Sequence, residues 1–182
     1  MSDYALFTSD CAPENSKSTL TELEALFGFV PNLAAAMALS PVLLKGFVGL
    51  FKNVHGGTLT EQQLQTLLLT NAVTNRCSWA VAFHSVLALK EGHDPADVQA
   101  MRQAQPPSEP RHAALSRLTR SLIEQRGQID ESEVRRFTDA GFEKAHLLEV
   151  IGVAAASTMT NYAGSVTKPA LEAAFQSQEW HA

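Results

Sequence analysis

Helix start and stop signals alternate along most of the chain, and they constrain its fold more than any other feature. Ser40-Pro41 and Asp94-Pro95 each pair a capping residue with a first-turn proline, and Thr60 with Gln63 has the spacing of a capping box. Glycines such as Gly28 stand where the helical period of apolar residues ends. No segment shows a sustained alternation of β-branched residues between turn signals. The sequence therefore predicts an all-α fold of six or more helices.

The domain boundary is expected near Thr19, which forms a capping-box pattern with Glu22. Residues 1–18 mix Ser, Asp, Pro, Asn and Lys without a period, and they are predicted to form a flexible N-terminal arm. The chain has 182 residues and 45% hydrophobic content, which suits one hydrophobic core. We therefore expect a single helical domain over residues 19–182.

Composition excludes several classes of protein. The net charge is -5 and the Lys and Arg residues are scattered, so no basic stripe is available for nucleic acid. The apolar stretches are shorter than the roughly 18 residues of a membrane span, and no signal peptide is recognisable, so a cytoplasmic location is expected. The cysteines and histidines lack metal-ligand spacing and no nucleotide-binding motif occurs, so no metal or other cofactor is expected.

The segment from Gln65 to His84 is the one that could carry chemistry. If a helix begins at Cys77, then Cys77, Ala80 and His84 share one of its faces. The helix N-terminus and the neighbouring Arg76 would lower the pKa of the Cys77 thiol. His84 could act beside it as an acid or a base. The candidate catalytic residues are Cys77, His84 and Gln65.

This segment resembles the AhpD-like branch of the carboxymuconolactone decarboxylase family, which carries Glu-x11-Cys-x2-Cys-x3-His across two successive helices. The four family positions are occupied here by Gln65, Cys77, Ala80 and His84. The resemblance extends from about Thr19 to Phe175 through Gly28–Leu33, Ser40-Pro41, Gly56–Leu59 and Asn161-Tyr162. It implies an AhpD-like helical domain with a central helical hairpin that carries the motif.

The resemblance also implies an activity, but the motif is degenerate. In the family the second cysteine attacks a peroxide, the first resolves it as a disulfide, and Glu and His relay the proton. Ala80 has no nucleophile and Gln65 cannot take up a proton as a carboxylate does, so the two-cysteine cycle cannot run here. Only Cys77 and His84 carry over.

Three hypotheses remain open. The first is a thiol-dependent antioxidant protein of the peroxidase type, in which Cys77 is the only redox group, His84 is its proton partner and an external thiol is the reductant. The second is a non-redox enzyme in which His84, assisted by Gln65, does acid–base work on a small organic acid or lactone. The third is a binding or assembly protein without catalysis. The resemblance implies a homo-oligomer, a trimer or hexamer, and the apolar segment from Leu147 to Ala156 is a plausible interface.

Several single residues also have two interpretations. Gln65 either hydrogen-bonds His84 and fixes its tautomer or covers the polar side of its helix. Glu61 either replaces the missing carboxylate or, the interpretation we favour, complements a helix dipole. Cys11 could act as a resolving thiol for Cys77, although a disulfide demands close placement. The other histidines are expected to be solvated: His55, His93, His112, His146 and His181.

Overall fold

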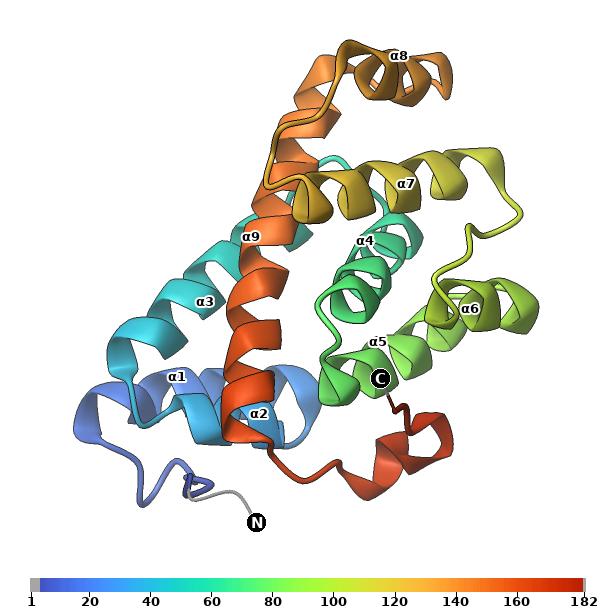
Figure 1. The fold of residues 1–182 in the computed structure, drawn as a ribbon. Helices are drawn as coiled ribbons and strands as arrows, with labels where there is room; N and C mark the ends of the chain where they lie inside the picture. The colour runs from blue at the N-terminus through green and yellow to red at the C-terminus, as the bar shows by residue number, and fades with distance from the viewer. Residues whose placement is uncertain (1–3, 182) are drawn as a thin grey trace.

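The structure, a computed structural model, describes residues 4–181, and its regular secondary structure consists of helices (Figure 1). Within these residues there is no strand, so the predicted all-α fold is confirmed. The helices, in chain order, are α1 (Glu14–Phe27), α2 (Asn32–Met37), α3 (Pro41–His55), α4 (Glu61–Thr74), α5 (Ser78–Lys90), α6 (Pro95–Arg102), α7 (Pro110–Glu124), α8 (Glu131–Asp139), α9 (Lys144–Thr167) and the short 3-10 helix η1 (Ala173–Gln178).

The helical hairpin of α4 and α5 lies at the centre of the arrangement, and α9 runs along the molecule beside it (Figure 1). Helix α9 packs against α2, α3, α4, α5 and α7, so it joins the N-terminal helices to the rest of the domain. Helix α5 also contacts α6 and η1. Two hydrophobic clusters result, one mainly among α1, α2, α3 and α5, the other among α4, α7 and α9.

Helix α4 contributes to both clusters, and every residue from Leu64 to Val73 is buried. Leu64, Leu67 and Leu68 pack in the cluster with α7 and α9, whereas Leu69, Ala72 and Val73 pack in the other. A helix that is buried all round must satisfy its polar side chains internally. Helix α4 does so, for example through Thr70 Oγ1, which donates to Ser116 Oγ at 2.9 Å.

Most of the predicted capping residues and the glycine stop stand at helix termini in the structure. Thr60 and Gln63 form the reciprocal capping box, with the Gln63 N–H 3.3 Å from Thr60 Oγ1 and the Thr60 N–H 3.0 Å from Gln63 Oε1. Ser40 Oγ accepts from the Leu43 N–H, and Gly28 ends α1 with φ at 80°. The beginning of α1 differs from the prediction.

Helix α1 begins at Glu14, so Thr19 lies inside it and does not cap it. The chain ahead of Thr19 is already packed, because Ala12 is buried and Ser16 Oγ donates to Ala38 O at 2.7 Å. The capping box predicted at Thr19 and Glu22 is therefore wrong. Residues 1–3 of the arm predicted over residues 1–18 lie outside the described residues, and the flexibility of the arm stays a prediction.

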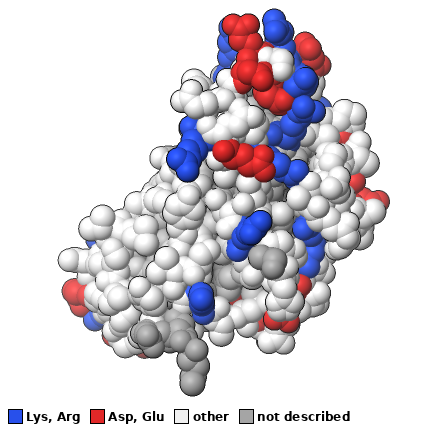
Figure 2. Space-filling model, in the orientation of Figure 1, with Lys and Arg blue, Asp and Glu red and all other residues white. Residues whose placement is uncertain are grey.

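The surface is unevenly charged. Figure 2 shows Lys, Arg, Asp and Glu side chains of both signs gathered over α8, where Glu133 pairs with Arg117 and Arg136. The outward side of α9 instead exposes Leu148, Ile151 and Tyr162. The homo-oligomer that these residues could support stays a prediction. Over residues 4–181 no helix combines the length and the apolar character that crossing a membrane requires.

Candidate functional site

The motif hairpin brings Gln65 and His84 together. Helix α4 is capped by Asn75, Arg76 adopts a left-handed conformation with φ at 53°, and Cys77 caps α5. This tight turn sets the two helices side by side, and His84 Nδ1 lies 3.1 Å from Gln65 Oε1. The hydrogen bond predicted between these residues is therefore present. A catalytic role for either residue stays a prediction.

His84 lines a pocket with a volume of about 70 Å³ that lies among α1, α2, α3, α5 and α9. A water molecule needs about 10–15 Å³ by this kind of measure, so the pocket can hold a small organic molecule. Its polar lining consists of His55, His84, Ser157 and Thr160. The rest is apolar and rich in aromatic rings, namely Phe27, Phe47, Phe51, Trp79 and Phe83.

The aromatic wall is held in place by its own contacts. Trp79 stacks on Phe83 with their centroids 4.9 Å apart, and Phe27 meets Phe83 edge to face at 6.0 Å. The Trp79 indole Nε1–H donates to Glu172 Oε2 at 2.9 Å, which satisfies its only polar atom away from the pocket. The stacking partners therefore present apolar faces to a ligand, and specificity must come from the few polar groups.

Burial, together with the charge of His55, lowers the pKa of His84 to about 3. The ring is therefore neutral near pH 7, since desolvation disfavours the imidazolium. With Gln65 Oε1 as the acceptor, the proton of the neutral ring resides on Nδ1 and Nε2 keeps a lone pair. His84 thus offers the pocket a neutral imidazole with Nε2 available to a ligand.

Cys77 is placed differently from what its motif position suggests. Ala80 and His84 line the pocket, whereas Cys77 does not. Its side chain packs on α9: a methyl carbon built at Gly164 would lie only 2.7 Å from Cys77 Sγ. Burial raises the pKa of the Cys77 thiol, and the backbone amide of Ala80 and the hydroxyl of Ser165 offset this only in part. The predicted lowering of the thiol pKa is wrong, because desolvation dominates and the exposed Arg76 is not among the groups that act on the thiol.

The two free thiols are expected to react very differently with a thiol reagent such as Ellman's reagent. Cys11 is exposed, and hydrogen bonds with Thr8 lower the pKa of its thiol. Cys77 is 2% exposed and should react at least about 10²-fold more slowly, because reaction requires local opening. Stopped-flow absorbance should show one fast equivalent in the native protein, none in Cys11→Ser, and a second equivalent only in denaturant. A fast equivalent in Cys11→Ser would show that Cys77 is accessible.

Two further residues belong to the site, and the sequence favoured neither: His55 was not predicted, and Glu61 was weighed as a replacement carboxylate but not preferred. His55, expected to be solvated, is the last residue of α3 and lines the pocket. Its Nδ1 lies 3.1 Å from Oε1 of Glu61, which had been interpreted as an ordinary first-turn acid. The signal was present in the sequence, because a short turn between a helix end and a helix start brings the two flanking residues close together. His84 and His55 therefore each have a partner for Nδ1, an amide in one case and a carboxylate in the other.

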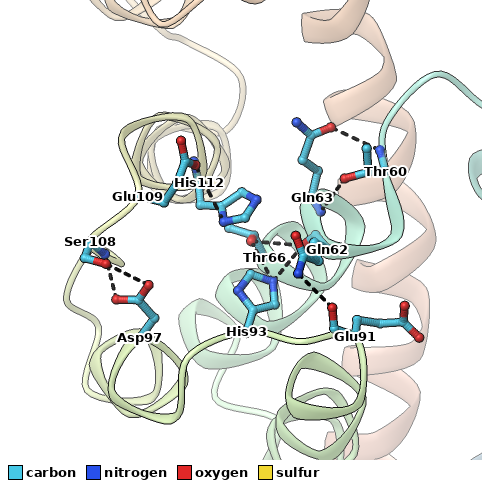
Figure 3. Close-up of polar contacts among 10 residues, drawn as sticks. All are labelled: Thr60, Gln62, Gln63, Thr66, Glu91, His93, Asp97, Ser108, Glu109 and His112. Atoms are coloured by element: carbon cyan, nitrogen blue, oxygen red, sulfur yellow. Dashed lines mark hydrogen bonds and ion pairs between the residues drawn. The ribbon is translucent and has the colours of Figure 1, made fainter.

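A second polar cluster lies around His93 and His112, away from the pocket lining (Figure 3). His93 is 6% exposed, so its predicted solvation is wrong. Its Nε2–H donates to Gln62 O at 2.9 Å, and its ring lies 4.9 Å from that of His112, whose Nδ1 is 3.6 Å from Glu109 Oε2. These contacts tie the turn after α5 to α4 and α7. Among the residues described, no three His, Cys, Asp or Glu side chains are grouped as a metal site would require.

Comparison with known proteins identifies the fold. No protein-family model and no curated protein sequence matches the chain. Among solved structures it is similar to the alkylhydroperoxidase AhpD core of an uncharacterized peroxidase-related protein from Ralstonia eutropha JMP134, with 16% identity, 96% of this chain and 94% of that chain covered, and a TM-score of 0.84. An uncharacterized peroxidase-related protein from Silicibacter sp. TM1040 has 18% identity, coverages of 97% and 95%, and a TM-score of 0.81.

A third similar structure contains a ligand. It is a cysteine-to-alanine variant of the debrominase Bmp8 in complex with 2,3,4-tribromopyrrole, with 17% identity, 98% of this chain and 97% of that chain covered, and a TM-score of 0.78. At these identities the likeness concerns the fold. The predicted AhpD-like fold with its central helical hairpin is therefore confirmed.

Proposed function

We propose that this chain, which has the AhpD-like fold, is an acid–base catalyst that binds a small neutral ring compound in the pocket and moves a proton with His84. The observation that carries this proposal is the pairing of a neutral imidazole, held through Nδ1 by Gln65, with an apolar pocket. The pocket lining contains no cysteine, since Ala80 occupies the position at which a nucleophile would face a ligand. This favours proton transfer over thiol chemistry.

The lining also supports a substrate class. Five aromatic side chains and several aliphatic ones suit a flat, uncharged ring, and no Lys or Arg among the described residues lines the pocket to pair with a free carboxylate. The debrominase with the same fold binds a small ring compound, tribromopyrrole. An unsaturated five-membered lactone has this size and shape, and it carries an acidic C–H bond next to its carbonyl group. We therefore propose such lactones as the substrates.

In the proposed step, Nε2 of His84 takes the proton from the carbon next to the carbonyl group. The electron pair of that C–H bond moves into the enolate, and the imidazolium returns the proton to the same or another carbon. Gln65 Oε1 accepts from Nδ1–H throughout and stabilises the charged ring. The enolate oxygen, negatively charged in an apolar site, favours the imidazolium that the empty pocket disfavours.

Deuterium exchange tests this function. Wild-type protein in D2O is expected to catalyse exchange of the acidic C–H of α-angelica lactone, measured by proton NMR. His84→Gln should lower the exchange rate about 10²-fold or more, since positioned general bases contribute about 10²–10⁴-fold. Cys77→Ala should exchange at the wild-type rate, because Cys77 lies outside the pocket lining.

Two results would contradict the proposal. One is a lack of exchange by the wild type above the buffer rate. The other is an equal rate in wild type and His84→Gln, which would assign the exchange to another group. If peroxide were consumed instead, and this activity disappeared in Cys77→Ala, the thiol-dependent hypothesis would replace the acid–base one.

A further inference from the structure

We infer that His55, oriented by Glu61, is the general acid of this pocket and donates a proton to the carbonyl oxygen while His84 removes one from carbon. The inference rests on the proposed function and extends it to a second catalytic residue. The step is balanced: the His55 Nε2–H proton goes to oxygen, the C–H proton goes to His84 Nε2, and the C–H electron pair forms the enol double bond. One positive charge moves from His55 to His84, and the developing enolate is protonated on oxygen as it forms, so the ligand becomes a neutral enol.

The surroundings of His55 suit a residue that carries this charge. Its Nδ1–H donates to the Glu61 carboxylate at 3.1 Å, so the ring is oriented and its charged form has a counter-ion. It is also the last residue of α3, where the helix dipole favours a cation. The Phe51 ring lies against it with centroids 4.2 Å apart, which limits rotation of the imidazole.

The other ring nitrogen of His55 has no partner in the protein. Nε2 is buried without a hydrogen bond, and it is the only such atom among the described residues that line the pocket. Leaving a buried nitrogen without a hydrogen bond is costly, and in native proteins such an atom needs an explanation. A ligand carbonyl oxygen that accepts from this nitrogen supplies one.

His55 and His84 are electrostatically coupled. They come from α3 and α5 but line the same pocket, and the charge of His55 contributes to the lowered pKa of His84. Two imidazoles that line one small apolar pocket share one proton more easily than they carry two, because like charges in such a site repel. The hydrogen-bond partner of each histidine decides whether it acts as the acid or the base. The carboxylate of Glu61 stabilises a cation on His55, and the neutral Gln65 leaves His84 as the base.

The turn that holds Glu61 opposite His55 is fixed from α9. Glu149 accepts from the Thr58 backbone N–H at 3.0 Å and from Thr58 Oγ1 at 2.7 Å. A methyl carbon at Gly57 would lie 2.8 Å from Glu149 Oε2, so a larger residue at this position would displace the carboxylate that holds Thr58. Glu61 is about half exposed, so its carboxylate connects the partly exposed imidazole to water and lets His55 regain its proton between turnovers.

The test compares His55→Phe and Glu61→Gln with wild type, using α-angelica lactone exchange and the NMR titration of His84. His55→Phe keeps an aromatic ring against Phe51 but cannot donate a proton. We expect it to lower kcat for exchange about 10²-fold with KM changed less than about threefold, and Glu61→Gln to lower kcat about tenfold. His55→Phe should also raise the titration midpoint of His84. His112→Gln is the matched control, because it removes a histidine that pairs with a glutamate outside the pocket.

The outcomes separate this inference from the function on which it rests. A loss in kcat and a raised His84 midpoint in His55→Phe, with His112→Gln unchanged, support the inference. Exchange that depends on His84 but is unchanged in His55→Phe overturns the inference and leaves the proposed function standing. The absence of exchange in the wild type overturns both.

Discussion

Lowering the pH from 7 to 4 is expected to reduce the free energy of unfolding by about 3 kcal/mol through His84 alone. The pKa of this ring is about 3 in the folded protein, against an ordinary value near 6.5. Between these values the unfolded chain binds a proton that the folded chain does not. The contribution is therefore fully present above pH 6.5 and is lost as the pH falls towards 3, at about 1.4 kcal/mol per pH unit.

Urea unfolding of wild type and His84→Gln at pH 7 and pH 4 measures this effect. The glutamine does not titrate and can still hydrogen-bond Gln65, so the variant should lose about 3 kcal/mol less than wild type over this range. Other groups, including His112 and Glu109, have a lowered pKa and destabilise both proteins in acid, so the difference isolates His84. His181→Gln, an exposed site, serves as the control. Equal losses in wild type and His84→Gln would mean that His84 titrates normally.

Replacing Gly164 with alanine is expected to destabilise the protein by about 2 kcal/mol. The added methyl carbon would lie 2.7 Å from Cys77 Sγ, and neither backbone can retreat easily because both helices are packed in the core. Alanine is more favourable than glycine in a helix by roughly 1 kcal/mol, so the expected net loss means that the clash costs more than this gain. Cys77→Ala removes the sulfur, so the double variant should recover most of the loss.

Thermal or urea unfolding of the four proteins in this cycle gives the coupling energy between the two positions. We expect about 1–3 kcal/mol, as for residues in direct contact. Gly49→Ala is the matched control, because this glycine is also helical, is exposed and has no atom within 4 Å of the added carbon. It should stabilise the protein by up to about 1 kcal/mol. Additive effects of Gly164→Ala and Cys77→Ala would show that the sulfur does not face α9.

The sequence predicts what local interactions decide. The starts of α3, α4 and α6 depend on capping residues at or next to the first turn, and these starts were predicted correctly. The start of α1 was not, because Pro13 caps it without a side-chain hydrogen bond, and its first turn is held instead by the hydrogen bond from Ser16 to Ala38, a residue distant in sequence. The end of α9 lacks a glycine signal, because Lys168 stops this helix in a left-handed conformation.

In the candidate site, too, contacts between residues close in sequence could be predicted, and contacts between distant residues could not. The contact of Gln65 with His84 follows from the hairpin spacing, which lies within one motif. The environment of Cys77 could not be predicted, because it depends on Gly164, a residue distant in sequence that arrives on another helix. His55 was misjudged since its neighbours in sequence, two glycines, are exposed, while its neighbours in space are the aromatic residues of the pocket.

The contact between Cys77 and Gly164 also limits how such a sequence can diverge over generations. A larger residue at 164 is tolerated only after the side chain at 77 has become smaller, so the two positions can change only in a set order. Exposed positions such as Gly49 carry no such condition. In descendants of this chain, positions 77 and 164 should therefore change together. A cysteine kept at position 77 can then reflect its packing against α9 and does not require selection for redox activity.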